Sequence, residues 1–242
     1  NGSGKSTLAR VLGGLLPYQE GEIWLDGQRL TPQAHQARAR VGLVFQDPEN
    51  QVVGSTVEED VAFGPENLGL PSAEIARRVD AALDAVGLRP FRHRPTRALS
   101  GGQRQLLAIA GALALEPELL ILDEPTAMLD ARGQEAVLSA LLQANRRRPV
   151  AVLWMTHRLD EALVAHRLVI LQHGRVAAQG PPGRLLAGRL GPLEQWHLSP
   201  PAVIRLAQAL RDRGIPVPEE ATSVEAVAGV LLRAWQARGV GR

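Results

Sequence analysis

Asn1-Gly2-Ser3-Gly4-Lys5-Ser6-Thr7 has the spacing of the second part of a phosphate-binding loop, G-x-x-x-x-G-K-[ST]. Gly2 and Gly4 allow a tight backbone that brings N–H groups close to a phosphate. Lys5 supplies an ammonium group for the β- and γ-phosphates of a nucleotide, and the Ser6 hydroxyl can bind Mg²⁺. The stretch therefore predicts a nucleotide site formed by residues 1–7.

The apolar run Leu8–Leu16 predicts a helix directly after this loop. The phosphate would then lie at a helix N-terminus, where free N–H groups and the helix dipole favour an anion. The alternative is a Gly-Ser-Lys turn that only caps an ordinary helix. The use of lysine favours the phosphate site, because Lys5 is the only lysine among the 27 lysines and arginines. A compact ammonium fits between phosphates better than a planar guanidinium does.

The composition is that of a globular protein and excludes several classes of site. The 242 residues suffice for one large domain, or for one domain with an appendage. No apolar run approaches the ~18 residues that a membrane-spanning helix needs. The sequence has no cysteine, which excludes disulfides and thiolate metal sites. The formal net charge is only +2, so the composition does not indicate nucleic-acid binding.

Apolar runs that alternate with helical patterns predict the central architecture. Buried strands are predicted over Val41–Phe45, Leu119–Leu122 and Val150–Met155, and helices lie between them. This alternation predicts an α/β fold of the P-loop NTPase type with a mainly parallel sheet. A strand normally precedes a phosphate loop, and it is not in the printed sequence. We therefore expect the sequence to be part of a longer protein that contains the first strands.

The remaining segments predict the domain organisation. Residues 21–27 predict a short antiparallel strand with an Asp-Gly turn, and residues 168–178 predict a final pair of strands. Residues from about 48 to 115 have helical spacing throughout and predict an inserted helical subdomain. The pattern changes after Pro192, which predicts a main domain over residues 1–192 and a small helical extension over residues 193–242.

Polar side chains follow three predicted strands at their carboxyl ends, where ligands bind in parallel α/β sheets. Asp123 is expected to bind Mg²⁺ together with Ser6 and the nucleotide. Glu124 is expected to take or orient the proton of an attacking water. Gln46 can bind Mg²⁺ or orient water, and His157 ends the third strand. The alternatives are a helix-capping Asp-Glu pair and structural roles for Gln46 and His157.

Ser100-Gly101-Gly102-Gln103 predicts a helix start with Ser100 as N-cap and Gln103 at the third position. Capping explains Ser100 and Gln103, but not two glycines in the first turn, which weaken a helix relative to alanine. Paired glycines allow backbone N–H groups to come close to a second anion. Because one phosphate loop is already present, we expect this second anion site to serve a neighbouring subunit.

These motifs, in this order and spacing, resemble the ATP-binding cassette (ABC) ATPase family over residues 1 to about 190. The family works as a head-to-tail dimer that holds two ATP molecules between its subunits. The resemblance implies a role for each matching position: ATP and Mg²⁺ ligands in Asn1, Gly2, Ser3, Gly4, Lys5, Ser6 and Thr7, a Q-loop glutamine in Gln46, a signature acting on the partner's γ-phosphate in Ser100, Gly101, Gly102 and Gln103, a Mg²⁺ ligand in Asp123, a catalytic glutamate in Glu124, a D-loop aspartate in Asp130 and a switch histidine in His157.

Two further stretches, Phe45–Gln51 and Thr56–Asn67, are similar to the ATPase subunits of energy-coupling-factor importers for vitamins and for cobalt or nickel. The tail from Leu198 to Pro216 resembles their C-terminal helical extension. Two positions depart from the ABC pattern. Leu106 stands where the family often has a basic residue, and Ala127-Met128 replaces the commoner Ser-Ala before Leu129-Asp130.

The resemblance implies an ATP-hydrolysing subunit of a membrane importer, peripheral on the cytoplasmic face of the plasma membrane. Its implied partners are a second ATPase subunit, identical or related, and integral membrane subunits, with no direct nucleic-acid contact. Three alternatives stay open: an ATPase of another ABC importer class, a soluble cassette ATPase that acts on DNA or ribosomes, and a degenerate nucleotide-binding partner. Glu124 and His157 count against the last of these. The sequence does not name the cargo.

Overall fold

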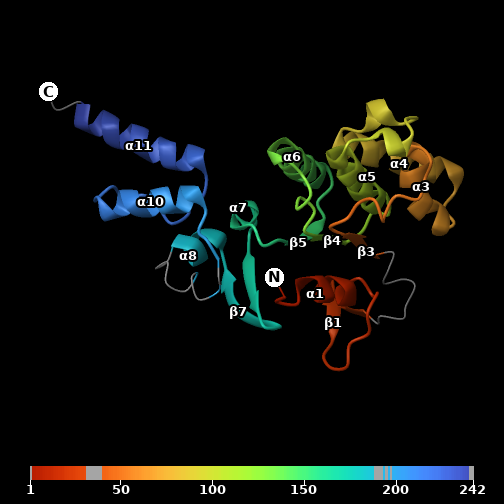
Figure 1. Cartoon of the computed structure of the whole chain (residues 1–242), viewed down its shortest axis with the longest axis horizontal. Coiled ribbons are helices and arrows are strands. Elements are labelled where there is room, and N and C mark those ends of the chain that lie inside the picture. Colours follow the sequence, from red (N-terminus) through yellow and green to blue (C-terminus); the bar gives the residue numbers. More distant parts are fainter. Residues whose placement is uncertain (1, 31–39, 188–192, 194–195, 197, 240–242) are drawn as a thin grey trace. The chain divides into compact units, whose positions relative to one another are not determined.

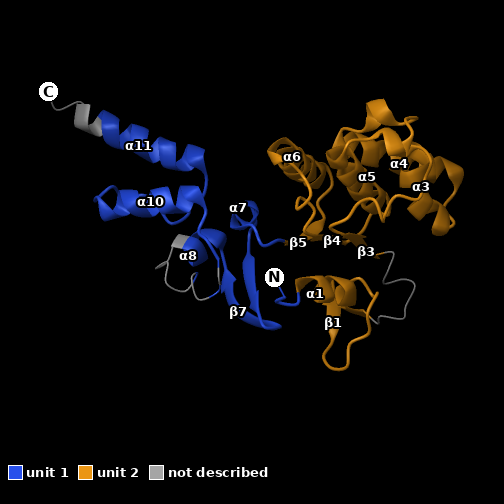
Figure 2. Cartoon of the chain, viewed as in Figure 1, with its two compact units in different colours: residues 1–4, 156–242 blue, residues 5–155 orange. Residues whose placement is uncertain are grey.

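The computed structural model describes residues 2–30, 40–187, 193, 196 and 198–239 (Figure 1). The chain forms two compact units (Figure 2). Unit 2 consists of residues 5–155, and unit 1 of residues 1–4 together with residues 156–242. Within the described ranges, no helix combines the length and apolar character that a membrane crossing requires.

A parallel sheet of three strands, in the order β3-β4-β5, lies at the centre of unit 2 (Figure 1). The strands are β3 (Val41–Val44), β4 (Leu119–Asp123) and β5 (Ala151–Met155). Val44 pairs with Leu122, and Asp123 pairs with Met155, so the three carboxyl ends lie at one edge. The parallel α/β sheet predicted from the apolar runs is confirmed.

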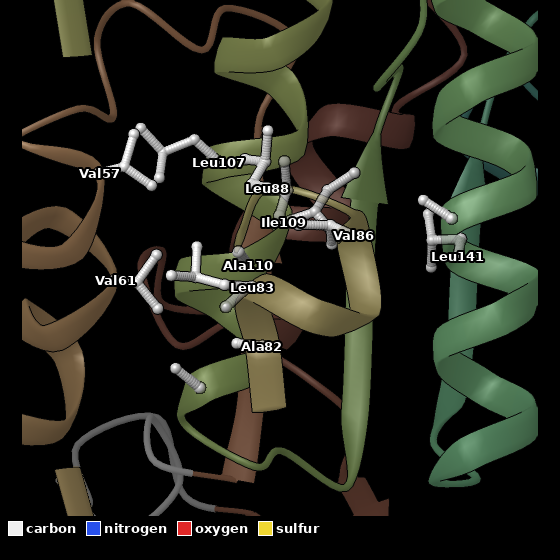
Figure 3. Packing of buried hydrophobic residues seen from close by; sticks show 14 of the residues in the cluster. Val57, Val61, Ala82, Leu83, Val86, Leu88, Leu107, Ile109, Ala110 and Leu141 are labelled. Carbon is white, nitrogen blue, oxygen red and sulfur yellow. The ribbon is translucent and has the colours of Figure 1, made fainter. Parts of the chain in front are cut away.

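The side chains of each strand point alternately to the two faces of the sheet, and they belong to two buried clusters, one on each face. Helix residues belong to both clusters, so helices cover both faces. Leu120 and Leu122 belong to the larger cluster with the helices on one face, and Figure 3 shows how these helices pack. Ile121 belongs to the second cluster with Ala9 on the other face. The helices of unit 2 are α1 (Lys5–Leu12), α3 (Val57–Asn67), α4 (Ser72–Val86), α5 (Gly101–Ala114) and α6 (Ala131–Arg147), with short 3₁₀ turns η1 (Arg89–Phe91) and η2 (Thr96–Ala98).

Glycines with positive φ lie at the turn between β1 (Ile23–Leu25) and β2 (Gln28–Leu30) and just after the end of α1. The antiparallel strands β1 and β2 are joined by Asp26-Gly27, with φ of 46° and 71°. Positive φ at both positions is the geometry of a tight hairpin turn, as the Asp-Gly pair predicted. The prediction that the first helix extends to Leu16 is wrong. α1 ends at Leu12, and Gly14 with φ of 70° takes a left-handed conformation that a continuing helix does not allow.

Unit 1 contains an antiparallel strand pair and the C-terminal helices (Figure 2). Its core includes Ile170, Leu186 and Ile204 in one cluster and Ala207 and Val227 in another. The predicted final strand pair is confirmed, and the tail that follows it contains helices, as predicted. The elements are α7 (Leu159–Ala162), β6 (Leu168–Gln172), β7 (Arg175–Gly180), α8 (Pro182–Ala187), α10 (Ala202–Asp212) and α11 (Val224–Gly239).

A buried carboxylate holds the loop that precedes α3. Asp60 is 8% exposed, and its Oδ1 accepts the N–H groups of Val53 at 2.7 Å and Gly54 at 2.9 Å. The Thr96 hydroxyl donates to the carbonyl oxygen of Gly54 at 2.9 Å. Burial raises the pKa of Asp60, although the two backbone hydrogen bonds act in the opposite direction. The loop is therefore stabilised by a carboxyl group whose ionisation carries a cost.

Two substitutions separate the hydrogen bonds of Asp60 from its charge. Asp60→Ala should lower the free energy of unfolding by roughly 2 kcal/mol, because two partly buried N–H donors lose their acceptor. Asp60→Asn keeps an oxygen acceptor and does not ionise. Burial raises the pKa of Asp60 in the folded protein above its ordinary value of 3.8. The stability that Asp60 contributes is therefore full below pH 3.8, and it is lost as the pH rises through the raised pKa.

Wild-type protein should therefore lose stability relative to Asp60→Asn as the pH rises from about 4 through the raised pKa of Asp60. Urea unfolding of both proteins over this range measures the difference. A constant difference across the range would contradict this account.

Candidate nucleotide-binding site

The glycines of the predicted phosphate loop have the backbone that the motif requires. Gly2 and Gly4 have φ of 74° and 96°, which residues with a side chain rarely adopt. The carbonyl oxygen of Ser3 accepts the N–H of Gly174 at 3.1 Å within unit 1. Asn1, which was predicted to bind ATP, lies outside the described residues.

Lys5, Ser6 and Thr7 form the first turn of α1, which begins three residues before the predicted helix start at Leu8. Lys5 is half-buried, whereas Ser6 and Thr7 are exposed. The first turn of a helix leaves backbone N–H groups without intrahelical partners, so this end of α1 can receive a phosphate. Ala9, one turn later, is fully buried and packs in the same cluster as Ile121 of β4.

Asp123 ends β4 with a buried side chain that is 4% exposed. Ile121 faces α1, and strand alternation places Asp123 on that same face. Its Oδ1 is buried and has no hydrogen-bond partner within the described part of the chain. Burying a charged oxygen without a partner costs free energy, which a bound cation would offset.

The residues present fit a Mg²⁺ ion bound together with a nucleotide. Mg²⁺ takes one or two carboxylates and completes its octahedron with phosphate oxygens and water. Asp123 supplies the carboxylate, and the exposed Ser6 hydroxyl lies at the start of the helix that covers the same face. The described residues hold no group of three His, Cys, Asp or Glu side chains that could bind a metal without help. The donor set therefore suits a metal site that the nucleotide completes.

Glu124 lies at a sharp bend directly after the strand. Its φ is 50°, and its N–H donates to the carbonyl oxygen of Met155 at 2.9 Å. Positive φ in a residue with a side chain costs free energy and is found where the surroundings hold it, often at functional sites. The alternative of a helix-capping Asp-Glu pair is wrong, because turns follow Glu124 and the next helix begins at Ala131.

Asp130 and Gln134 hold the segment between Glu124 and α6. Asp130 is the N-cap of α6, and its Oδ1 accepts the N–H of Gly133 at 2.8 Å. The Gln134 Nε2 donates to the carbonyl oxygens of Leu129 at 2.8 Å and Thr126 at 3.4 Å. The sequence did not predict the role of Gln134, because no sequence pattern indicates that a glutamine in the first turn of a helix will bond to the carbonyl oxygens of the preceding turn.

The predicted capping box at the start of α5 is confirmed. The Ser100 Oγ accepts the N–H of Gln103 at 3.3 Å, and the Gln103 Oε1 accepts the N–H of Ser100 at 2.9 Å. A Cβ on Gly101 would lie 4.0 Å from Leu129, and one on Gly102 would lie 3.7 Å from the Cα of Gly133, both ordinary contacts. The packing of the described residues therefore does not require either glycine.

Gln46 and Glu124 lie at equivalent positions on neighbouring strands. Val44 pairs with Leu122, so Gln46 and Glu124 each lie two residues beyond this pair, at the same edge of the sheet. Gln46 is exposed and Glu124 is half-buried. His157 is exposed and belongs to unit 1, where the Thr156 Oγ1 accepts the N–H of Arg158 at 2.9 Å and closes a turn around it.

Comparison with known proteins identifies the family of the chain. Residues 1–127 match the model of the ABC transporter family. The chain is 46% identical over 237 residues to the energy-coupling factor transporter ATP-binding protein EcfA1 of Symbiobacterium thermophilum, covering 97% of this chain and 82% of that protein. It is 44% identical over 225 residues to EcfA of Methanosarcina acetivorans, covering 92% and 81%.

A solved structure is similar as well. The structure of cbiO1 from Clostridium perfringens, described as part of the ABC transporter complex cbiONQ, has a TM-score of 0.73 and 36% identity to this chain. The likeness covers 85% of this chain and 83% of cbiO1. The chain therefore belongs to the ABC transporter family of ATPases, among the ATP-binding proteins of energy-coupling factor transporters.

Proposed function

We propose that this chain hydrolyses ATP to power a membrane importer that takes up vitamins or transition-metal ions. The observation that carries the proposal is the buried Oδ1 of Asp123, which lacks a partner in the described part of the chain and lies on the face covered by α1. A metal–nucleotide complex would supply that partner. The names of the relatives support coupling of this ATPase to transport.

Each residue of the site has a role in this proposal. Lys5 binds the β- and γ-phosphates, and the N–H groups of the loop and of the first turn of α1 hold the phosphate oxygens. Ser6 and Asp123 hold Mg²⁺, which neutralises phosphate charge when it is bound, with Gln46 as a further ligand or as a group that orients water. Glu124 takes or orients the proton of the attacking water.

The signature residues act on the nucleotide of a second ATPase subunit, which is a copy of this chain or a related one. Gly101 and Gly102 carry this step, because the packing of the described residues does not require them to be glycine. The two glycines lie at the start of a helix of 14 residues. Because they have no side chains, the N–H groups there can come close to a phosphate that another subunit binds. Asp130 would act as the D-loop aspartate, and His157 would act as the switch histidine.

The helical subdomain, residues 48 to 115, would contact the membrane partner and hold the protein at the cytoplasmic face of the membrane. Val53, Phe63 and Leu68 of this segment expose apolar side chains, with exposed fractions of 60%, 49% and 42%. Apolar side chains on a surface indicate a contact with another protein when they gather there. We assign residues 1–192 to the ATPase domain and residues 193–242 to a C-terminal helical extension.

Lys5→Arg tests whether the only lysine is a phosphate ligand. A planar guanidinium does not replace a compact ammonium between two phosphates, so we expect kcat/KM for ATP to fall by about 100-fold. Steady-state ATPase measurements with Mg²⁺ on the full-length protein give this ratio. Arg10→Lys, the reverse exchange at the exposed last turn of α1, should stay within about twofold of wild type. Normal activity of Lys5→Arg would overturn the role of Lys5.

A second experiment separates the importer from an ATPase that acts on DNA or ribosomes. The importer subunit should co-purify with membrane proteins from membranes washed free of nucleic acid. Its ATPase rate should not change when DNA or ribosomes are added to the full-length protein. Stimulation by nucleic acid together with release from the membrane fraction would favour the alternative.

A further inference from the structure

The end of strand β3 is held by a side chain rather than by another strand. Within the described part of the chain, β3 has β4 on one side only. On the other side, the Oε1 of Gln51 accepts the N–H of Phe45 at 2.9 Å. The Nε2 of the same side chain makes a long contact of 3.5 Å with the carbonyl oxygen of Leu43. One carboxamide therefore engages two backbone groups at the strand end.

These two backbone groups are the ones that a neighbouring strand would use. Groups on residues two apart in a strand point to the same side, so the N–H of Phe45 and the carbonyl of Leu43 form one pairing position. A carboxamide has one oxygen acceptor and one N–H donor group, as a peptide unit has. Gln51 is half-buried, which shields the shorter of these bonds from competition with water.

The chain reaches this position through a compact turn that begins at Asp47. The Oδ1 of Asp47 accepts the N–H of Glu49 at 3.0 Å, and the N–H of Gln51 donates to the carbonyl oxygen of Pro48 at 3.1 Å. Glu49 also forms an ion pair with Arg104 of α5, at 3.0 Å. The turn is therefore closed locally and tied to the helix that carries the signature.

We propose that Gln51 is a positioning residue for Gln46. The amide that it holds belongs to Phe45, the residue directly before Gln46, so the bond determines the direction in which the chain leaves β3. Gln46 is exposed, so its own side chain is not confined by packing, and the backbone on either side must set its position. This inference rests on the role proposed for Gln46 in ATP hydrolysis.

Two substitutions at position 51 separate the acceptor from the bulk of the side chain. Gln51→Met keeps the length and loses the acceptor, so kcat for ATP should fall by about threefold to tenfold, with a smaller change in KM. Gln51→Glu keeps an oxygen acceptor for the N–H of Phe45, so its kcat should stay within about twofold. Gln143→Met is the matched control, because Gln143 is an exposed residue of α6 that bonds only to Ser139 among the contacts that the structure describes.

A double-mutant comparison tests whether Gln51 acts through Gln46. In a protein that carries Gln46→Ala, the further change Gln51→Met should not lower kcat by more than about twofold. Hydrogen exchange of the nucleotide-free protein gives an independent readout, because the amide of Phe45 should exchange faster in Gln51→Met than in wild type. If Gln51→Met does not fold, Gln51→Asn carries the same expectations, since its amide is one methylene too short to reach Phe45.

The outcomes distinguish this inference from the proposed function. An active wild-type protein whose Gln51→Met variant has normal kcat and an unchanged Phe45 amide would overturn the inference alone. Equal losses in Gln51→Met and Gln51→Glu, or a full further loss in the Gln46→Ala background, would also overturn it. A wild-type full-length protein without ATPase activity would overturn the proposed function, while exchange at Phe45 would still report whether Gln51 holds the strand end.

Discussion

Glu124→Gln should lower the rate of ATP hydrolysis by roughly 10²- to 10⁴-fold and leave the affinity for ATP within about threefold of wild type. The amide has the same shape as the carboxylate but cannot take a proton from the attacking water. The bend at Glu124, with its φ of 50° and its N–H bond to Met155, is a backbone feature that the substitution leaves intact. Single-turnover hydrolysis and equilibrium nucleotide binding on the full-length protein measure the two quantities.

The control for this result is Glu135→Gln, the same exchange on the exposed face of α6. It should hydrolyse ATP at the wild-type rate, because surface substitutions away from special features have small effects. Turnover of Glu124→Gln at the wild-type rate would refute the role of Glu124 as the base. A loss of ATP binding in parallel with turnover would instead show that Glu124 holds the nucleotide.

Mixing two inactive variants should restore activity if the signature acts on the nucleotide of a partner copy. Lys5→Ala removes the phosphate ligand, and Gly102→Asp places a negative charge where the partner's γ-phosphate would bind. Each protein alone should lose ATPase activity by about 100-fold or more. An equal mixture should recover roughly a quarter of wild-type activity, because half of the dimers are mixed and one of their two sites is intact.

The mixture distinguishes sites built by two chains from a site built by one. If Lys5 and Gly102 served the same nucleotide within one chain, no mixed dimer would contain an intact site and the mixture would stay inactive. Gly102→Asp alone should still bind ATP at its own Lys5, which fluorescence titration with a nucleotide analogue measures. Failure of the mixture despite dimer formation would contradict action in trans between copies of this chain.

Local patterns in the sequence predicted most of the strands and helices and their order, but not α7 and α8. Alternation and helical spacing predicted β4, the helical segment of residues 48 to 115 and the strand pair of unit 1, because the burial of a side chain depends on the period of the backbone that carries it. A glycine marked a turn in the same way, since Asp26-Gly27 joins β1 and β2 where the sequence predicted an Asp-Gly turn. The one clear error, the extension of α1 to Leu16, came from an apolar run that continued past Gly13-Gly14.

The candidate site was predictable at the level of residue types, because short motifs place their ligands close together along the chain. The supporting contacts were not predictable. Gln51 returns to the strand end that it follows, Gln134 bridges two carbonyl oxygens of the preceding turn, and Asp60 holds two amides of the loop before α3. Each of these contacts requires a particular path of the loop, which no residue pattern specifies.

The sequence alone determined which side chains can bind a phosphate, a cation and a water, and that they follow consecutive parallel strands. Only the tertiary structure decided that Asp123 faces α1 with a buried oxygen, and that Glu124 leaves the strand at positive φ. The physical reason is the range of the forces involved. Backbone periodicity acts between residues a few positions apart, whereas burial and strain depend on strands and helices that the chain brings together from distant positions.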